Sequence, residues 1–240
     1  MAGVSTLRTA RDRARSEITA EILATAREHL AVDGAAGLSL RAVARDLGLV
    51  SSAVYRYFEN RDALLTALII DSYDALGDAA EQSVAASSRR RPHDRWVLAA
   101  EAIRGWAIAH PHEYALLYGS PVPGYAAPQD TVVPGTRVSL ALIGIIDDAW
   151  RAGRLVVPDP LAAPGKGRAS SAVVQREVAL LAATIGNGLP PSVLFAGLLA
   201  WTQLFGLLSF ELFGQLEGVV GDRGAFFREA ASATADRMGL

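Results

Sequence analysis

The sequence predicts an all-α fold in two parts, an N-terminal domain of three helices and a larger helical domain after it. Apolar residues recur three or four positions apart through most of the chain, which is the spacing of one buried helical face. Glycine and proline gather between these segments, where they end helices. The 240 residues include no cysteine, so we expect neither a disulfide nor a thiolate metal site.

Charge alone does not favour a nucleic-acid partner. The net charge is −2, with 8 basic and 7 acidic residues in 1–60 and 15 basic and 18 acidic residues in 61–240. A DNA-binding protein nevertheless needs only a locally positive face, because salt screens charges over distances of about 10 Å. The N-terminus also lacks the apolar core of a secretory signal, so we expect a cytoplasmic protein.

The first 15 residues are polar and hold four arginines, Arg8, Arg11, Arg13 and Arg15. We interpret residues 1–15 as a flexible basic arm. Two roles remain open for it: a disordered tail, or an arm whose arginines reach DNA phosphates or the minor groove. The first helix of the N-terminal domain is expected to begin at about residue 16 and to end at about residue 32.

Residues 38–65 contain two short helices joined by a tight turn, and a third helix follows. The buried face of the first helix is marked by Val43, Ala44 and Leu47. Gly48 follows, where a sharp turn needs a residue that adopts positive φ. Either Ser51 or Ser52 is expected to cap the second helix with its hydroxyl.

The second short helix has an inner and an outer face. Val54 and Phe58, four residues apart, lie on the inner face, and the outer face carries Ser52, Tyr55 and Arg56. Two helices held at a steep angle by a turn of three or four residues form a helix-turn-helix. The second helix of that motif fits into the major groove of DNA.

Three features carry a family resemblance: the Leu47-Gly48 turn, the run Tyr55-Arg56-Tyr57-Phe58, and Arg61. With them the stretch resembles the DNA-binding domain of the TetR family of transcriptional repressors. The resemblance extends back into the first helix and covers about 60 residues. It implies that residues 16–60 are a helix-turn-helix domain for double-stranded DNA. Because one such domain buries little surface, we expect a homodimer on an inverted repeat.

The resemblance implies DNA-binding roles for Ser39, Arg41, Ser51, Ser52, Ala53, Tyr55, Tyr57 and Arg61. The four residues of the second helix are expected to face the groove, and Arg41 resembles a position that reaches guanine. Tyr57 and Arg61 match positions that contact phosphate. Two alternatives stay open: Ser39 only caps a helix, and Tyr57 packs in the core.

The rest of the chain, residues 61–240, is predicted to be a helical ligand-binding and dimerisation domain. Asn60 is expected to cap its first helix. The helices are expected over residues 61–87, 94–110, 114–118, 136–152 and 221–238, with loops over 119–135 and 153–171. The first of these helices leaves the DNA-binding domain, so we expect it to transmit any change between the two domains.

The segment from Trp106 to Pro111, the residues Tyr114, Leu117 and Tyr118, and the segment 119–125 resemble a C-terminal ligand-binding domain found in one TetR subgroup. Aromatic and polar side chains of this kind suit an apolar cavity for a small, unidentified ligand, although each alone also suits a core. The candidate ligand-binding residues are Trp96, Trp106, His110, Tyr114, Tyr118, Tyr125 and Phe205.

Residues 178–210 include no charged residue, a run of 33 that is long enough to cross a membrane. Glycines and prolines at 186–191 divide the run, so we interpret it as a helical hairpin at a dimer interface rather than as a membrane span. Two hairpins, one from each subunit, would form a four-helix bundle. The candidate interface residues are Ala196, Gly197, Ala200, Trp201, Leu204 and Leu208.

A helical enzyme is a rival hypothesis. His110, His112 and Glu113 superficially suggest a metal or acid–base site, but neighbours in a segment that breaks a helix seldom converge on one ion. The sequence contains no nucleophile elbow, phosphate loop or dinucleotide-binding glycine pattern. We therefore expect no catalytic residue, metal ion or cofactor. A DNA-binding regulator that works without a ligand is the second alternative.

Overall fold

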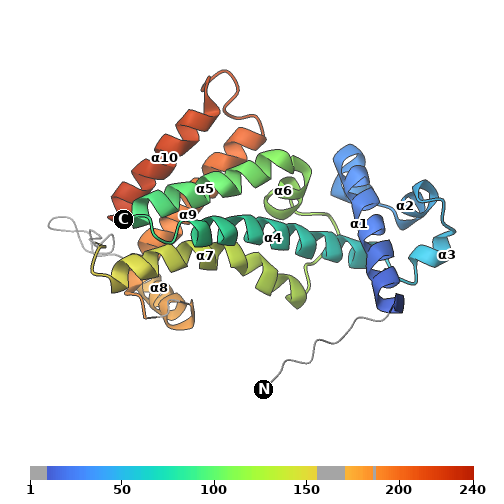
Figure 1. The fold of residues 1–240 in the computed structure, drawn as a ribbon, viewed down its shortest axis with the longest axis horizontal. Helices are drawn as coiled ribbons and strands as arrows, with labels where there is room; N and C mark the ends of the chain where they lie inside the picture. Colours follow the sequence, from blue (N-terminus) through green and yellow to red (C-terminus); the bar gives the residue numbers. More distant parts are fainter. Residues whose placement is uncertain (1–9, 156–170, 186–187) are drawn as a thin grey trace. The chain divides into compact units, whose positions relative to one another are not determined.

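The computed structural model describes residues 10–155, 171–185 and 188–240. These ranges form ten α-helices and one short 3₁₀ helix, with no β-strand among them (Figure 1). The predicted all-α fold is confirmed. Of the two loops predicted from proline and glycine, most of the second lies outside the described residues.

The chain divides into two compact units. Unit 1 contains the described residues up to Tyr73 together with His110–Val132, and unit 2 contains Asp74–Ala109 and Val133–Leu240. The boundary falls within the long helix α4 (Arg61–Ala86), which was predicted to cover 61–87. The sequence-based domain division after residue 60 therefore differs from these units, because unit 1 also includes the first half of α4 and a segment from later in the chain.

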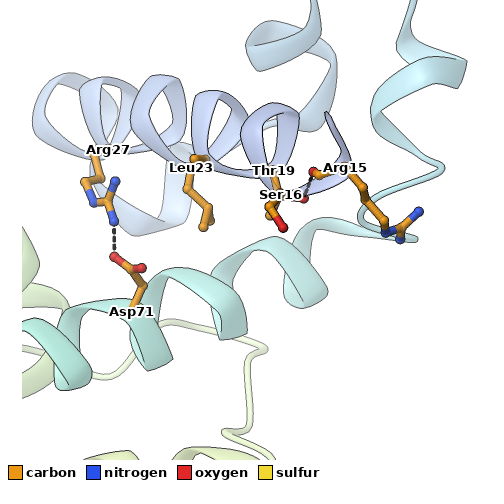
Figure 2. Close-up of a pocket in the computed structure, with 7 residues that line it drawn as sticks. Arg15, Ser16, Thr19, Leu23, Arg27 and Asp71 are labelled. Carbon is orange, nitrogen blue, oxygen red and sulfur yellow. Dashed lines mark hydrogen bonds and ion pairs between the residues drawn. The ribbon is translucent and has the colours of Figure 1, made fainter. Parts of the chain in front are cut away.

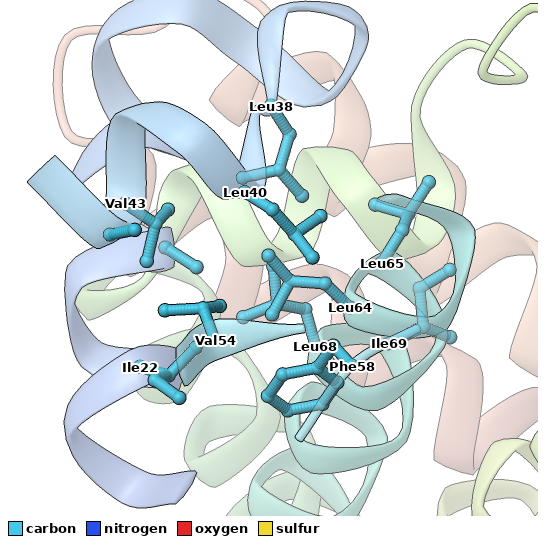
Figure 3. Packing of buried hydrophobic residues seen from close by; sticks show 12 residues of the cluster. Ile22, Leu38, Leu40, Val43, Val54, Phe58, Leu64, Leu65, Leu68 and Ile69 are labelled. Atoms are coloured by element: carbon cyan, nitrogen blue, oxygen red, sulfur yellow. The ribbon is translucent and has the colours of Figure 1, made fainter. Parts of the chain in front are cut away.

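Unit 1 is built on α1 (Ala10–Gly37), α2 (Leu40–Asp46) and α3 (Ser51–Val54), with the first half of α4. Its core unites one apolar face from each helix. Figure 3 shows Ile22 of α1, Val54 of α3 and Leu68 of α4 packed with Phe58. These side chains are at most 7% exposed, so the helical spacing seen in the sequence identified the core of this unit correctly.

The N-terminal boundary of α1 corrects the prediction of a flexible arm. Residues 10–15 form the first turns of α1, and residues 1–9 lie outside the described part of the chain. Alanine and arginine are good helix formers. Asp12 in the first turn interacts favourably with the positive end of the helix dipole. At the other end, Gly34 breaks the helical geometry with φ of 68°, where the sequence predicted the stop.

Helix α6 (Pro111–Tyr118) and the segment after it also belong to unit 1. Helix α6 packs against α1, and Leu116, Leu117 and Tyr125 contact the core of the unit. The 3₁₀ helix η1 (Gln129–Thr131) completes this insertion. Sequence analysis grouped these residues with the C-terminal domain, because the order of the chain does not show which core an inserted helix joins.

Unit 2 contains the second half of α4 and the helices α5 (Pro92–Ala109), α7 (Val132–Arg151), α8 (Ala172–Ile185), α9 (Pro191–Leu212) and α10 (Arg223–Met238). Helix α10 packs on α5 and α9, and α8 packs on α9 (Figure 1). The Asp222 carboxylate caps α10 by accepting from the Ala225 amide at 2.9 Å, and Gly239 ends it with φ of 75°.

Two arginines fix helices to one another in unit 2. Arg104 of α5 makes a bidentate pair with Glu211 of α9, with contacts of 2.9 and 2.6 Å. Arg137 of α7 bonds Asp74, Asp78 and Glu81, which lie on one face of α4. Its guanidinium crosses α4 beside Gly77, where an added Cβ would lie only 2.9 Å from Arg137.

Helix α9 is long and apolar enough to cross a membrane by length and composition, with 39% of its most apolar window buried in the protein. The described structure corrects the predicted interface face. Ala200, Leu204 and Leu208 are at most 3% exposed within the single chain, and Gly197 faces Ile146 of α7. Among the six predicted interface residues, only Ala196 and Trp201 keep partial exposure. The apolar surface that remains is a different row: Leu198, Leu199, Phe210 and Phe213.

Candidate nucleic-acid interface

The turn between α2 and α3 is built by backbone hydrogen bonds around Gly48. This glycine has φ of 66°, as the sequence predicted. The Leu49 amide donates to the Ala44 carbonyl at 2.8 Å, and the Gly48 amide donates to the Arg45 carbonyl at 3.0 Å. This pair of bonds is the Schellman arrangement that closes a helix C-terminus. These backbone bonds close α2 and set the direction in which the chain leaves it.

The predicted serine cap of α3 is wrong. Val50 occupies the N-cap position, no side chain caps the helix, and Ser51 is its first residue. The hydroxyls of Ser51 and Ser52 are therefore not used for capping. The prediction for Asn60 is confirmed, since its side-chain oxygen accepts from the Ala63 amide at 2.8 Å.

Helix α3 presents one apolar and one polar face. Val54 is fully buried and Phe58, just beyond the helix, is 7% exposed. Ser52 and Arg56 are exposed and Tyr55 is 43% exposed, whereas Ser51 and Ala53 are half-buried. The four predicted groove residues Ser51, Ser52, Ala53 and Tyr55 thus retain accessible surface.

The two predicted residues near α2 also lie at the surface. Arg41, in the first turn, is exposed. Ser39 occupies the N-cap position with φ of −140°, but its side chain makes no capping hydrogen bond. The alternative role of Ser39, capping α2 with its hydroxyl, is therefore not observed.

Tyr57 and Arg61 were expected to contact phosphate, and both make contacts within unit 1. Tyr57 is half-buried against the core, with the Arg15 guanidinium 5.1 Å from its ring centre. An Arg61 amino group donates to the carbonyls of Ala35 and Ala36 at 2.7 and 3.3 Å. Arg61 therefore satisfies carbonyls at the C-terminal end of α1, which commits part of its guanidinium to the fold.

A histidine connects α1 to the end of α2. His29 Nε2 lies 2.7 Å from Asp46 Oδ2. This hydrogen bond is the main reason why the pKa of the Asp46 carboxyl lies below its ordinary value. Arg45 makes a smaller contribution in the same direction. The contact helps to hold the two helices that support the turn.

The seven predicted ligand-binding residues are divided between the units. Trp96, Trp106 and Phe205 belong to unit 2, and His110, Tyr114, Tyr118 and Tyr125 belong to unit 1. In unit 1 the Tyr118 ring lies 5.0 Å from Tyr114 and 6.2 Å from Tyr73 between ring centres. Burial raises the pKa of Tyr118. The Tyr125 hydroxyl lies 2.9 Å from Thr66 Oγ1, so these tyrosines pack and bond inside unit 1.

Trp96 is the member of this set with an unsatisfied polar group. Its side chain is fully buried, and its indole N–H has no hydrogen-bond partner among the described residues. Buried donors in native proteins normally have a partner, so this N–H is suited to a bound water or ligand. Phe205 is also buried, with its ring 5.4 Å from that of Trp201.

Two kinds of accessible residue around α3 were not among the eight predicted DNA-binding residues. Val50, at the turn, is 72% exposed, although its apolar character suggested no surface role. Arg15 and Arg56 are exposed beside Tyr57. A positive charge at position 56 was visible in the sequence, but it occupies the variable position of the aromatic run.

A hollow of about 420 Å³ lies between α1 and α4 within unit 1. Figure 2 shows Arg27 reaching Asp71 at one end of this hollow and Arg15 extending away at the other. Arg27 also lies 3.9 Å from Glu113 of α6. These ion pairs account for Arg27, so Arg15 is the basic residue of this hollow that points outward. Among the described residues, no group of three or more histidine or carboxylate side chains is placed to hold a metal ion.

Comparison with known proteins agrees with this arrangement. Residues 22–68 match the family described as bacterial regulatory proteins of the tetR family, and residues 96–234 match the family described as tetracyclin repressor-like, C-terminal domain. The chain is 40% identical over 205 residues to HTH-type transcriptional regulators of Mycobacterium bovis and Mycobacterium tuberculosis, which covers 84% of this chain and 83% of each relative.

Solved structures share the fold. The crystal structure of the protein SCO4313 has a TM-score of 0.76 and 30% identity, covering 95% of this chain and all of that one. The TetR family regulator PfmR from Thermus thermophilus has a TM-score of 0.55 at 15% identity, covering 90% of this chain and 96% of its own. The relatives with assigned roles are regulators, which excludes the enzyme hypothesis. The exposed α3, the Schellman turn and both family matches show that this chain belongs to the TetR family of transcriptional regulators.

Proposed function

We propose that the chain is a cytoplasmic repressor that binds an inverted-repeat DNA operator as a homodimer and releases it when a small molecule binds. The two-sidedness of α3 supports the DNA contact. Val54 is sealed in the core, while Ser52 and Tyr55 remain accessible on the opposite face. Hydroxyl groups bond to base edges or phosphates, and the exposed Arg41 supplies a bidentate donor for guanine.

The surface of α8 and α9 supports a homodimer. Exposed apolar residues on these helices include Leu180 at 70%, Leu199 at 50% and Phe210 at 55%. Exposed apolar side chains on two helices that pack on each other favour a protein interface. A two-fold axis through α8 and α9 gives each subunit the same contact and presents two copies of α3 to two half-sites.

Ligand control rests on Trp96. A small molecule with a hydrogen-bond acceptor would pair the indole N–H, which has no partner among the described residues. Its binding is expected to alter α4 and to change the separation of the two α3 helices. Release of DNA then requires the ligand to favour the wrongly spaced state by several kcal/mol.

Selection of bound fragments from the source genome tests this function. The expected result is a small set of fragments that share an inverted repeat, bound by two chains per duplex. Fragments without a shared sequence would contradict a specific regulator. Addition of candidate metabolites to the selected complex then identifies the ligand by loss of binding. Trp96→Phe serves as a variant that keeps an aromatic side chain and removes the N–H.

A ligand-independent DNA-binding regulator is the second candidate. The observation that favours it is the packing of the Tyr114 and Tyr118 rings on each other and the hydrogen bond between the Tyr125 hydroxyl and Thr66, all within unit 1. In that case no metabolite would change operator affinity, and Trp96→Phe would bind the operator as the native chain does.

A further inference from the structure

A second hollow in unit 1, of about 390 Å³, lies beside the segment that follows α3. The first turns of α1 provide one wall, with Arg11 and Arg15. Arg56 and Tyr57 provide the other wall. Asp12 also lines the hollow, so three guanidinium groups stand against one carboxylate. The hollow is therefore strongly basic, although the whole chain has a net charge of −2.

Helical spacing explains why these arginines converge. Arg11 and Arg15 are four residues apart and lie on one face of α1, whereas Arg13 lies between them on a different face and does not line the hollow. All three arginines of the hollow are exposed. Among the described residues, Arg11 and Arg56 form no ion pair, in contrast to Arg27 and Arg137.

Arg15 also organises the tyrosine at the rim. Its guanidinium carbon lies 5.1 Å from the centre of the Tyr57 ring, within the range of a cation–π contact. Figure 2 shows that Arg15 extends away from the Arg27–Asp71 pair, which lies at the other end of the hollow between α1 and α4. The Arg15 guanidinium therefore lies against the Tyr57 ring, which lines the basic hollow.

The contacts of Arg61 explain why a basic hollow elsewhere in unit 1 would help DNA binding. The motif assigns phosphate binding to this position, but here Arg61 donates to the Ala35 and Ala36 carbonyls. The guanidinium groups of the hollow supply positive charge beside Arg56 and Tyr57, which directly follow the exposed Tyr55 in the chain. A planar guanidinium can bond two phosphate oxygens at once, which suits the backbone of a duplex.

We propose that Arg11, Arg15 and Arg56 form a clamp for the phosphodiester backbone next to the bases that α3 contacts, and that Arg15 positions Tyr57 for the same strand. The inference rests on the proposed function, since it assigns extra contacts to the same DNA. It extends the interface from α3 to the start of α1. The contacts are with phosphates, so they add affinity without sequence preference.

Glutamine variants test the clamp. The variants Arg11→Gln, Arg15→Gln and Arg56→Gln are compared with Arg13→Gln, a matched control with the same charge change on another face of α1. Fluorescence anisotropy measures affinity for the operator and for a scrambled duplex across a range of KCl concentrations. Each clamp variant is expected to bind both duplexes about tenfold more weakly or worse, because each dimer loses two charged hydrogen bonds.

The salt dependence separates phosphate contacts from other causes. Each phosphate contributes about 0.9 to the slope of log affinity against log salt, so a dimer that loses two contacts should show a slope lower by about 1.8. A site that held only a free anion would leave this slope unchanged and would overturn the clamp. Clamp variants that behave as Arg13→Gln does would also overturn it, while leaving the selectivity of the native chain, and so the proposed function, intact. Loss of selectivity in the native chain would overturn both.

The positioning role of Arg15 has its own readout. Arg15→Lys keeps the charge but not the flat stacking surface, so it should retain the salt slope and still lose affinity. The effects of Arg15→Gln and Tyr57→Phe should combine to less than their product, because Arg15→Gln displaces the hydroxyl that Tyr57→Phe removes. An Arg15→Lys variant that matches the native chain would overturn the positioning role. Thermal unfolding, expected to be unchanged in the arginine variants because their side chains are exposed, excludes a structural cause.

Discussion

Two exposed surfaces of this chain are of opposite character. On α3 and directly after it the accessible residues are Ser52, Tyr55 and Arg56, which carry hydroxyl groups or charge. On α9 they include Leu199 and Phe210, which carry neither. The difference matches what each surface is proposed to contact, since DNA offers phosphates and base edges and a second subunit offers apolar area.

The pattern of apolar residues also differs between the two helices. Around α3, one apolar side chain in each turn is buried and the polar residues alternate with it, so one face is fixed. Helix α9 is apolar on several sides. Some of its apolar residues, such as Leu204, are buried within the chain, and others, such as Phe210, are exposed. A helix of that kind needs cover on more than one face.

The inner and outer residues at α3 should separate stability from DNA binding. Phe58→Ala removes a ring from the core of unit 1 and is expected to lower the free energy of unfolding by about 3–5 kcal/mol. Tyr55→Ala, on the exposed side, is expected to change it by no more than about 0.5 kcal/mol while weakening operator binding. Chemical denaturation and anisotropy measure the two quantities. Equal destabilisation by both variants would contradict the two-sided description of α3.

A charge on the apolar surface of α9 should break the dimer. Phe210→Glu is expected to give monomers in sedimentation velocity. It is also expected to weaken operator binding by about 100-fold or more, because the two DNA-binding domains are then no longer linked and must bind their half-sites separately. Val219→Glu is the matched control, since Val219 is 75% exposed and lies beyond α9. A dimer that survives Phe210→Glu but not Val219→Glu would place the interface elsewhere.

Within unit 2, the Arg137 network should contribute a smaller, salt-sensitive stability. Hydrogen bonds to Glu81 and Asp78 raise the pKa of Arg137, and its three carboxylate partners are about half exposed. After allowance for solvent screening, Arg137→Gln is expected to cost about 1 kcal/mol, and the cost should shrink as salt increases. Thermal unfolding at low and high salt measures this. A cost that does not depend on salt would indicate packing as its source.

The smallest expected effect concerns acid. The pKa of Asp46 is lowered mainly by its hydrogen bond with His29, so the carboxylate stabilises the fold above the ordinary carboxyl pKa of about 3.9 and loses this contribution as pH falls through the lowered value. His29→Gln should reduce stability at neutral pH and show a weaker loss below about pH 4. Parallel pH profiles for the two proteins would show that the contact does not contribute.

Sequence alone predicted the helix-turn-helix well because its determinants are local. Leu47 and Gly48 define the turn, Val54 and Phe58 define the inner face, and Asn60 caps the helix that follows. Each of these depends on residues within four positions. The serine cap failed for a local reason too, because the chain uses Val50 at the N-cap and leaves the hydroxyls exposed.

The features that could not be predicted from the sequence depend on residues far apart in the chain. Periodicity identifies residues that share a face but not the element that the face meets. Gly197 and Leu208 therefore suggested a partner subunit, although they pack inside the chain. In the same way, Tyr118 and Tyr125 were grouped with the C-terminal domain, although both belong to unit 1. The basic hollow brings together residues 11 and 56, which no local pattern connects.

The stoichiometry of the DNA complex tests the central claim most directly. Sedimentation velocity with a labelled operator duplex measures how many chains bind and whether they bind together. The account predicts two chains per duplex, bound cooperatively through the exposed apolar surface of α9 and lost together in Phe210→Glu. One chain per duplex at full affinity would contradict it.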